Sequence, residues 1–241
     1  KRVELIPGKK YIILSATANE GLYRKLFPKG LEFIDLSQVE FKGQVIQFSD
    51  KSFSRSALKR NEDRLKVAEN FLPNLPVITF KKLGLTIPEA DQTVYYGKCE
   101  GYNHLSGKDI RIIGTPHLNV GTYLLVAKAL GIELPPDAAQ LRQMKVQHNG
   151  FEYYLYTFEN EHLRAIQFYF IERELIQAIG RARLTDNEAV VFLFSDFPIP
   201  GAEKYYIKET EKIEQRYKEY VQKKSEKNLK SGSGKQLKLG V

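Results

Sequence analysis

Short apolar runs recur along this 241-residue chain, and between them lie more polar stretches whose apolar residues have helical spacing. Runs rich in β-branched and aromatic residues and bounded by turn residues are typical of strands buried on both faces of a parallel sheet. We therefore predict an α/β fold, with a mostly parallel sheet of six or so strands and helices on both faces. The predicted strands cover residues 11–14, 31–36, 45–48, 77–80, 94–96, 109–114 and 189–194.

The stretches between these runs predict the helices. Segment 51–70 is basic, and its cations are interpreted as a solvated helix face in preference to a nucleic-acid contact. An apolar helix is expected at 122–131, and a longer amphipathic helix begins at Glu161. Towards the end of the chain, residues 201–229 predict a long charged helix and residues 230–241 a disordered tail.

Residues 144–158 predict a β-hairpin inserted into this fold. Its turn is Asn149-Gly150, the pair that type I′ turns favour. An apolar face is expected from the pairs His148–Phe151, Val146–Tyr153 and Met144–Leu155, and the other face from Lys145, Gln147, Glu152, Tyr154 and Tyr156. Two interpretations stay open, namely a hairpin packed on its own domain or a pin that touches or splits nucleic acid.

Four short motifs follow strand-like runs in a fixed order. In the last, Q-x-x-G-R, Gln177 and Arg181 are four positions apart, so a helix presents the amide and the guanidinium on one face. The other three are Ser-Ala-Thr at 15–17, Val-Ile-Thr-Phe at 77–80 and Ile-Ile-Gly-Thr-Pro at 112–116. Together they resemble motifs III to VI of superfamily 2 helicases, and the resemblance covers residues 11–198.

The resemblance implies a RecA-like (P-loop NTPase-like) fold for residues 25–200, with residues 1–24 as the end of a first motor domain and a linker. It implies the C-terminal half of an ATP-dependent nucleic-acid helicase or translocase, with DNA favoured over RNA. The printed chain holds no G-x-x-x-x-G-K-[ST] sequence and no Asp-Glu pair after an apolar strand, the parts that hold ATP and Mg²⁺. ATP and Mg²⁺ are therefore expected only together with an N-terminal RecA-like ATPase domain, and the chain alone is expected to be inactive.

The resemblance also assigns roles to individual residues. Gln177, Gly180, Arg181 and Gly121 are expected at the ATP site, where Arg181 and Arg183 are the catalytic candidates. The nucleic-acid candidates are Thr79, Lys81, Asn103, Thr115, His117 and Asn119. Ser15, Ala16 and Thr17 are expected to couple the two halves, although the same stretch also fits a helix cap made by Thr17 or Asn19.

The spacing of the two catalytic arginines departs from the family pattern. A second arginine is expected three residues after the first, where this chain has Leu184. Arg183 comes two residues after Arg181, which turns its side chain by about 200° on a regular helix. Either the helix ends between Gly180 and Arg183, or Arg183 pairs with Asp186 or Glu188. We expect Arg181 to be the main phosphate ligand and Arg183 to be auxiliary.

Composition adds the remaining limits. A net charge of +8 favours a polyanionic partner. The single cysteine, Cys99, fits a reducing cytoplasm, and the four histidines lack metal-ligand spacing, so no metal site is expected. No apolar run is long enough to span a bilayer, so no membrane partner is expected. The alternatives are a translocase subunit of a nuclease or restriction system and a non-catalytic nucleic-acid-binding scaffold.

Overall fold

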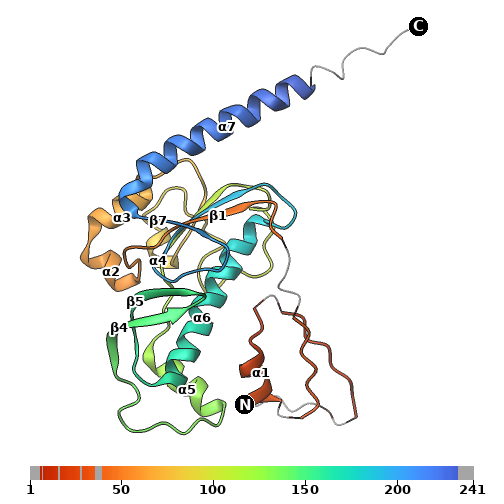
Figure 1. Cartoon of the computed structure of the whole chain (residues 1–241), viewed down its shortest axis with the longest axis vertical. Coiled ribbons are helices and arrows are strands. Elements are labelled where there is room, and N and C mark those ends of the chain that lie inside the picture. Colours follow the sequence, from red (N-terminus) through yellow and green to blue (C-terminus); the bar gives the residue numbers. More distant parts are fainter. Residues whose placement is uncertain (1–5, 7, 16, 28, 36–39, 233–241) are drawn as a thin grey trace.

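A five-stranded parallel sheet forms the centre of the fold, in the order β2-β3-β6-β1-β7. The computed structural model describes residues 6, 8–15, 17–27, 29–35 and 40–232 (Figure 1). The architecture is α/β and consistent with a RecA-like fold, as predicted. The strands are β1 (Gln44–Phe48), β2 (Val77–Ile78), β3 (Ile110–Ile113), β6 (Val190–Phe194) and β7 (Glu203–Tyr205).

Alternation along β6 divides the core between the two faces of the sheet. On one face Phe192 and Phe194 pack edge-on against Phe71, with ring centroids 5.0 and 5.5 Å away. Tyr217 lies 5.1 Å from Phe192 on the same side. Val191 and Leu193 are fully buried and point to the opposite face, on the side where α6 lies in Figure 1. Helices therefore cover both faces.

The described residues form seven α-helices and two 3₁₀ turns. Side-chain caps begin five of them on Asn19, Ser54, Asn61, Asn119 and Asn160, each accepting from backbone N–H groups of the first turn. The helices are α1 (Glu20–Leu26), α2 (Arg55–Arg60), α3 (Glu62–Asn70), α4 (Lys81–Gly84), α5 (Val120–Ala129), α6 (Glu161–Ile179) and α7 (Thr210–Gly232). The 3₁₀ turns are η1 (Gly180–Ala182) and η2 (Ile207–Glu209). None of these helices combines the length and apolar character needed to cross a membrane.

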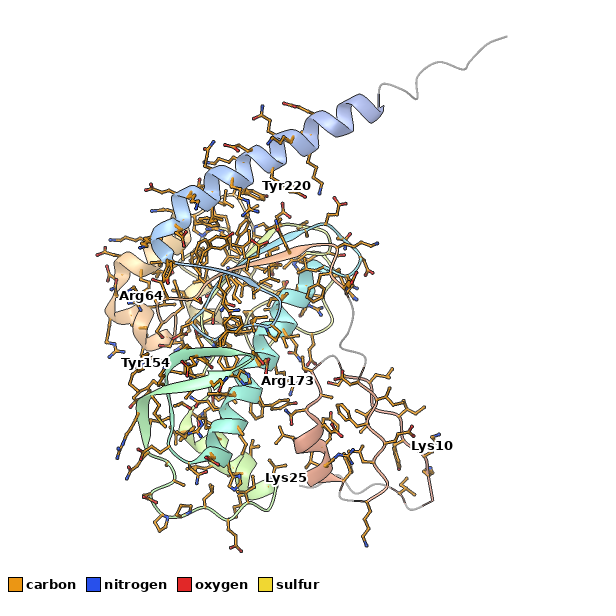
Figure 2. All side chains as sticks on the ribbon, viewed as in Figure 1. Lys10, Lys25, Arg64, Tyr154, Arg173 and Tyr220 are labelled. Atoms are coloured by element: carbon orange, nitrogen blue, oxygen red, sulfur yellow. The ribbon has the colours of Figure 1, made fainter. Side chains whose placement is uncertain are left out.

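The predicted hairpin is confirmed, with β4 (Leu141–His148) paired to β5 (Phe151–Phe158) in the predicted register. Its tip is tied to the body of the protein. The Asn149 side chain donates to the Glu172 carboxylate at 2.8 Å and to the Pro198 carbonyl at 3.0 Å. The outer face stays open to solvent and carries Tyr154, which is labelled in Figure 2. This geometry favours a hairpin packed on its own domain over a projecting pin.

Several predicted elements are wrong. Residues 11–14 and 31–35 form no strand, and 94–96 contribute only one bridge, between Tyr95 and Lys98. Ile12 and Leu14 are 79% and 91% exposed, because no strand in the described part of the chain pairs with them. At 94–96 the chain reverses at Gly97, whose φ is +86°. Leu36 lies outside the described residues.

The elements at the carboxyl end of the chain also differ from the prediction. Residues 201–209 hold β7 and η2, so the long helix starts only at Thr210 and runs on to Gly232. The strand β7 was missed because it is a three-residue edge strand with a charged sequence and no apolar run. In segment 51–70 the predicted single helix is divided at Asn61, which ends α2 and caps α3. Residues 233–241 of the predicted tail lie outside the described residues.

Candidate functional site

The end of α6 forms the first polar region of interest. The α-helix stops at Ile179, one 3₁₀ turn follows, and Arg183 takes the left-handed conformation with φ 53° and ψ 54°. The Arg183 N–H donates to the Gly180 carbonyl at 3.2 Å. Of the two alternatives for the arginine spacing, the helix that ends is therefore the observed one. The 200° rotation of a regular helix does not apply to Arg183.

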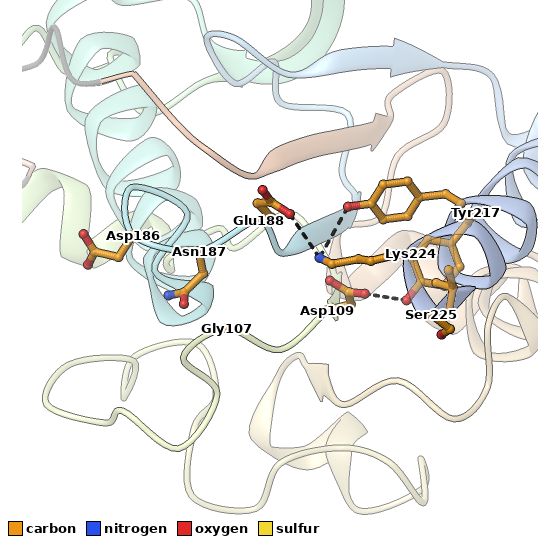
Figure 3. Close-up of a pocket in the computed structure, with 10 residues that line it drawn as sticks. Gly107, Asp109, Asp186, Asn187, Glu188, Tyr217, Lys224 and Ser225 are labelled. Carbon is orange, nitrogen blue, oxygen red and sulfur yellow. Dashed lines mark hydrogen bonds and ion pairs between the residues drawn. The ribbon is translucent and has the colours of Figure 1, made fainter. Parts of the chain in front are cut away.

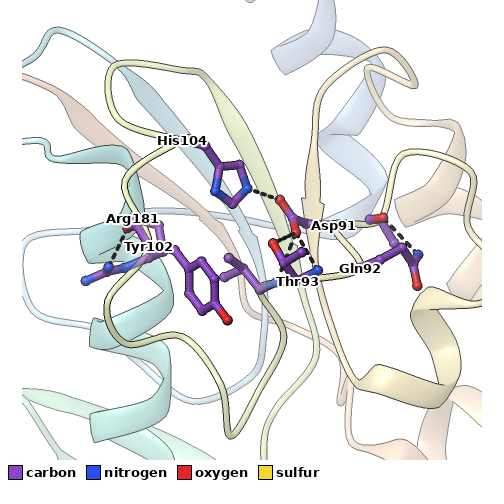
Figure 4. A network of polar contacts seen from close by, with 8 residues as sticks. Asp91, Gln92, Thr93, Tyr102, His104 and Arg181 are labelled. Atoms are coloured by element: carbon purple, nitrogen blue, oxygen red, sulfur yellow. Dashed lines mark hydrogen bonds and ion pairs between the residues drawn. The ribbon is translucent and has the colours of Figure 1, made fainter.

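Loop 97–108 lies against this end of α6 and binds its polar side chains. The Glu100 carboxylate accepts from Gln177 at 2.9 Å and from Arg173 at 3.1 Å. Arg181 donates to the Tyr102 carbonyl at 2.7 Å (Figure 4). Thus Gln177, Gly180, Arg181 and Arg183 lie within one short stretch that the loop borders. Asn103, expected at nucleic acid, belongs to this group because its side chain accepts from Arg183 at 2.9 Å.

The two arginines differ in how free they are. Arg181 is half-buried and donates to two backbone carbonyls, those of Tyr102 and Gln177. Arg183 is exposed, and within the described residues its guanidinium donates to one side chain, that of Asn103. Neither Asp186 nor Glu188 forms an ion pair with Arg183 in the described residues, and Glu188 pairs instead with Lys224 at 3.4 Å. Arg183 therefore gives up fewer hydrogen bonds than Arg181 when its guanidinium binds a ligand.

A second polar region lies at the carboxyl edge of the sheet. The Thr115 hydroxyl, which follows β3, bonds to the Ser195 hydroxyl at 2.9 Å and to the Asp196 carboxylate at 2.5 Å. Burial raises the pKa of Asp196, and the Thr115 and Ser52 hydroxyls and the Arg64 charge act in the opposite direction. Sequence reasoning missed Ser195 and Asp196. Their signal was available, since two polar residues directly follow the buried run at 189–194.

Two of the nucleic-acid candidates are occupied inside the domain. The Thr79 side chain is 2% exposed and donates to the Ile113 carbonyl at 2.7 Å. Thr115 is fully buried in the cluster just described. Neither hydroxyl reaches the surface. Lys81, by contrast, is exposed at the surface, and its ammonium lies 5.4 Å from the centre of the Tyr95 ring.

The remaining candidates lie beside the middle of α6. His117 is within 3.2 Å of the Gln167 side chain, and burial, with a smaller effect of Arg55, lowers its pKa to about 4. Asn119 caps α5 by accepting from the Thr122 N–H at 2.9 Å, which puts Gly121 in the first turn of that helix. Gln167 and Arg181 are fourteen positions apart, which is roughly 20 Å along a helix. Gly121 therefore lies away from Arg181, with the His117 group.

Ser15 and Thr17, of the Ser-Ala-Thr motif, contact each other locally. The Thr17 N–H donates to the Ser15 hydroxyl at 3.3 Å, and neither residue has a neighbouring strand in the described part of the chain. Asn19, one of the two residues suggested as a cap, does cap α1. Ala16 lies outside the described residues. No contact in the described residues connects this stretch to the α6 end.

A shallow pocket of about 510 Å³ separates α7 from the amino ends of the strands (Figure 3). Its polar side chains bind one another. The Asp109 carboxylate accepts from Tyr217 at 2.5 Å, and the Lys224 ammonium contacts Glu188 and lies 3.5 Å from the Tyr220 hydroxyl. These contacts fix α7 on the sheet. In the described residues no group of three or more His, Cys, Asp or Glu side chains could hold a metal ion.

A turn held by Asp91 supports loop 97–108 (Figure 4). One Asp91 oxygen accepts from the Thr93 N–H at 2.8 Å and the Val94 N–H at 2.9 Å, and the other bonds to His104. Burial works to raise the pKa of Asp91, but the hydrogen bonds from His104, Thr93 and Val94 outweigh it and lower this pKa to about 2.

This depressed pKa predicts a loss of stability in acid. A carboxylate with a lowered folded-state pKa stabilises the fold above its ordinary pKa of 3.8 and loses that contribution as the pH falls towards about 2. Asp91→Asn should therefore be less stable than the wild type at neutral pH, and the difference should shrink below about pH 4. Urea unfolding across this range measures it. Asp63→Asn, at a 95% exposed carboxylate, is the control, and a difference for Asp91→Asn that stays constant with pH would contradict the assignment.

Comparisons with known proteins add no relative to this geometry: no protein-family model, no curated protein and no solved structure matches the chain.

Proposed function

We propose that this chain is the second RecA-like half of an ATP-driven nucleic-acid motor of the superfamily 2 type. The observation that supports the proposal is the group at the end of α6. There a helix packed on a parallel sheet ends in a 3₁₀ turn, and Gln177, Arg181 and Arg183 lie together beside one loop. An arginine presented from one domain to a nucleotide held by another is a common way to stabilise the charge that develops in phosphoryl transfer.

In this proposal the residues of the group have separate roles. Arg183 extends towards the phosphates, since its guanidinium is exposed and has one neutral side-chain partner among the described residues. Arg181 keeps loop 97–108 on the helix through the Tyr102 carbonyl, and so positions Asn103 and Arg183. Gln177, whose side-chain amide donates to the Glu100 carboxylate, makes the second polar contact with the nucleotide. The P-loop half supplies the lysine and the Mg²⁺ ligands of the site.

The nucleic-acid part of the proposal depends on charge and exposure. The chain carries a net charge of +8, and the exposed candidates at the carboxyl side of the sheet are Lys81 and Asn119. The buried Thr79 and Thr115 hydroxyls act in this proposal by shaping the edge. DNA is the proposed polymer.

The chain alone is expected to hydrolyse no ATP, because the printed sequence lacks the catalytic lysine and the magnesium-binding carboxylate. Steady-state ATP turnover with and without single-stranded DNA measures this. A protein that joins the chain to a P-loop half is the positive control and should respond to DNA. Robust turnover by the chain alone that Arg181→Ala or Arg183→Ala abolishes would overturn the two-half proposal.

A further inference from the structure

Cations and aromatic rings alternate along one surface of the domain. The Arg55 guanidinium lies 4.7 Å from the centre of the Phe80 ring, and Lys81 follows directly in sequence. The Lys81 ammonium lies 5.4 Å from the Tyr95 ring. The Lys98 ammonium lies 5.8 Å from the same ring and 5.4 Å from Tyr102. We call this row the cation–aromatic strip, and it consists of Arg55, Phe80, Lys81, Tyr95, Lys98 and Tyr102.

The fold fixes the strip at both ends and in the middle. At one end Phe80 is buried, with its ring 5.1 Å from that of Tyr96. In the middle a tight turn pairs Tyr95 with Lys98. At the other end the Tyr102 carbonyl accepts from Arg181. The strip therefore runs from the carboxyl edge of the sheet to the end of α6, and joins the two polar regions of the candidate site.

The cations of the strip are not neutralised. Arg55, Lys81 and Lys98 form no ion pair with a carboxylate in the described residues, unlike, for example, Lys145, which pairs with Glu152 at 2.7 Å. Three carboxylates that contact loop 97–108 or belong to it have other partners. Glu174 accepts from the Gly97 N–H at 2.6 Å, Glu100 binds Arg173 and Gln177, and Asp91 binds His104.

We infer that the cation–aromatic strip binds single-stranded nucleic acid. Lys81 and Lys98 contact phosphates, and the half-buried rings of Tyr95 and Tyr102 stack on bases. A single strand fits better than a duplex, since stacking on a side chain requires an unstacked base. This inference rests on the proposed function and adds to it the surface and the chemistry by which the polymer is held. Lys81 was already a nucleic-acid candidate, whereas Tyr95, Lys98 and Tyr102 are new as nucleic-acid contacts.

Fluorescence anisotropy of a labelled single-stranded oligothymidylate, about 15 nucleotides long, tests the inference with the full chain. The double variant Lys81→Gln/Lys98→Gln is expected to bind about 20-fold more weakly at about 0.1 M salt. The slope of log affinity against log salt should flatten by about 0.7 for each lysine lost. Tyr95→Leu is expected to lose about tenfold with little change in that slope.

A matched control removes the same charge elsewhere. Lys128→Gln/Lys208→Gln changes one exposed lysine on α5 and one on η2, and Lys208 also lies 5.3 Å from a tyrosine ring, that of Tyr206. This control should bind like the wild type. Equal losses in the control and the strip variant would overturn the inference, as would wild-type binding by the strip variant. Circular dichroism and thermal unfolding verify that each variant is folded.

Three further outcomes distinguish this inference from a general polyanion surface and from the proposed function. One outcome is that a polyglutamate peptide binds the chain as tightly as the oligonucleotide does, with neither affinity changed by Tyr95→Leu. In that case the strip is a general polyanion surface and the inference fails. If the strip variant binds like the wild type while a motor containing the chain still shows DNA-stimulated ATP turnover, the strip fails and the proposed function stands. Loss of strip binding with no DNA response of the motor would instead overturn the proposed function alone.

Discussion

Replacing Arg183 with alanine is expected to slow ATP turnover about a thousandfold in a motor that contains this chain, with a smaller change in nucleotide affinity. An arginine presented in trans contributes mainly where charge develops in the transition state, so its loss acts on the chemical step. Arg183 is exposed and takes the left-handed conformation just after the 3₁₀ turn, and in the described part of the chain its guanidinium donates to the neutral Asn103 side chain alone. Single-turnover ATP hydrolysis with saturating DNA measures the chemical step directly.

Arg181→Ala provides the comparison, because the two arginines are two residues apart and differ in their partners. Arg181 holds the Tyr102 and Gln177 carbonyls, so its loss should loosen loop 97–108 and lower thermal stability as well as turnover. Arg183→Ala should leave thermal stability unchanged. A far larger loss of turnover for Arg181→Ala at unchanged stability would make Arg181 the phosphate ligand, as the sequence pattern first suggested. If neither substitution slows turnover, the assignment of this motif is wrong.

Arg111→Met is expected to destabilise the fold by about 3 to 5 kcal/mol, a loss expected when a buried charged hydrogen-bond donor is removed. Arg111 is fully buried in β3, and its guanidinium donates to the carbonyls of Ala68, Glu69, Pro73 and Leu75. These carbonyls lie at the end of α3 and in the segment that leads into β2. Methionine fills the space of the side chain but leaves all four acceptors without their partner.

Thermal and urea unfolding of the purified chain measure this effect. For a chain of this size, 3 to 5 kcal/mol corresponds to a fall in melting temperature of about 10 °C. Arg142→Met is the control, because that side chain is 61% exposed and its ion pair with Glu159 lies at the surface. The control should change stability by less than about 0.5 kcal/mol. Similar losses in the two variants would show that Arg111 does not hold the α3 end.

The hairpin was predictable residue by residue, since its information is local. The type I′ turn requires positive φ at both central residues, which Asn149 and Gly150 adopt readily, and alternation on each side of the turn fixes the register. The strands β1, β3 and β6 were predictable for a related reason. Their apolar runs are buried on both faces, so no other position in the fold suits them.

Tertiary structure alone decided which apolar runs became strands. A strand exists only where a neighbour accepts its backbone hydrogen bonds, and that neighbour is distant in sequence. Residues 11–14 have the composition of a strand but no partner in the described part of the chain, whereas the charged β7 is a strand because β1 has a free edge beside it. The composition of a segment indicates neither whether a partner strand is available nor whether a sheet edge is free.

The candidate site divides in the same way. The sequence by itself determined that Gln177, Arg181 and Arg183 belong together, since they lie on one helix and the turn that ends it. It could not determine that Arg181 is held by the Tyr102 carbonyl, 79 residues away along the chain, while Arg183 stays exposed. The positions of Asp196 and of the charged but fully buried Arg111 were also decided in three dimensions. Desolvating a charge is acceptable only where distant parts of the chain converge to bind it, and that convergence is a property of the fold.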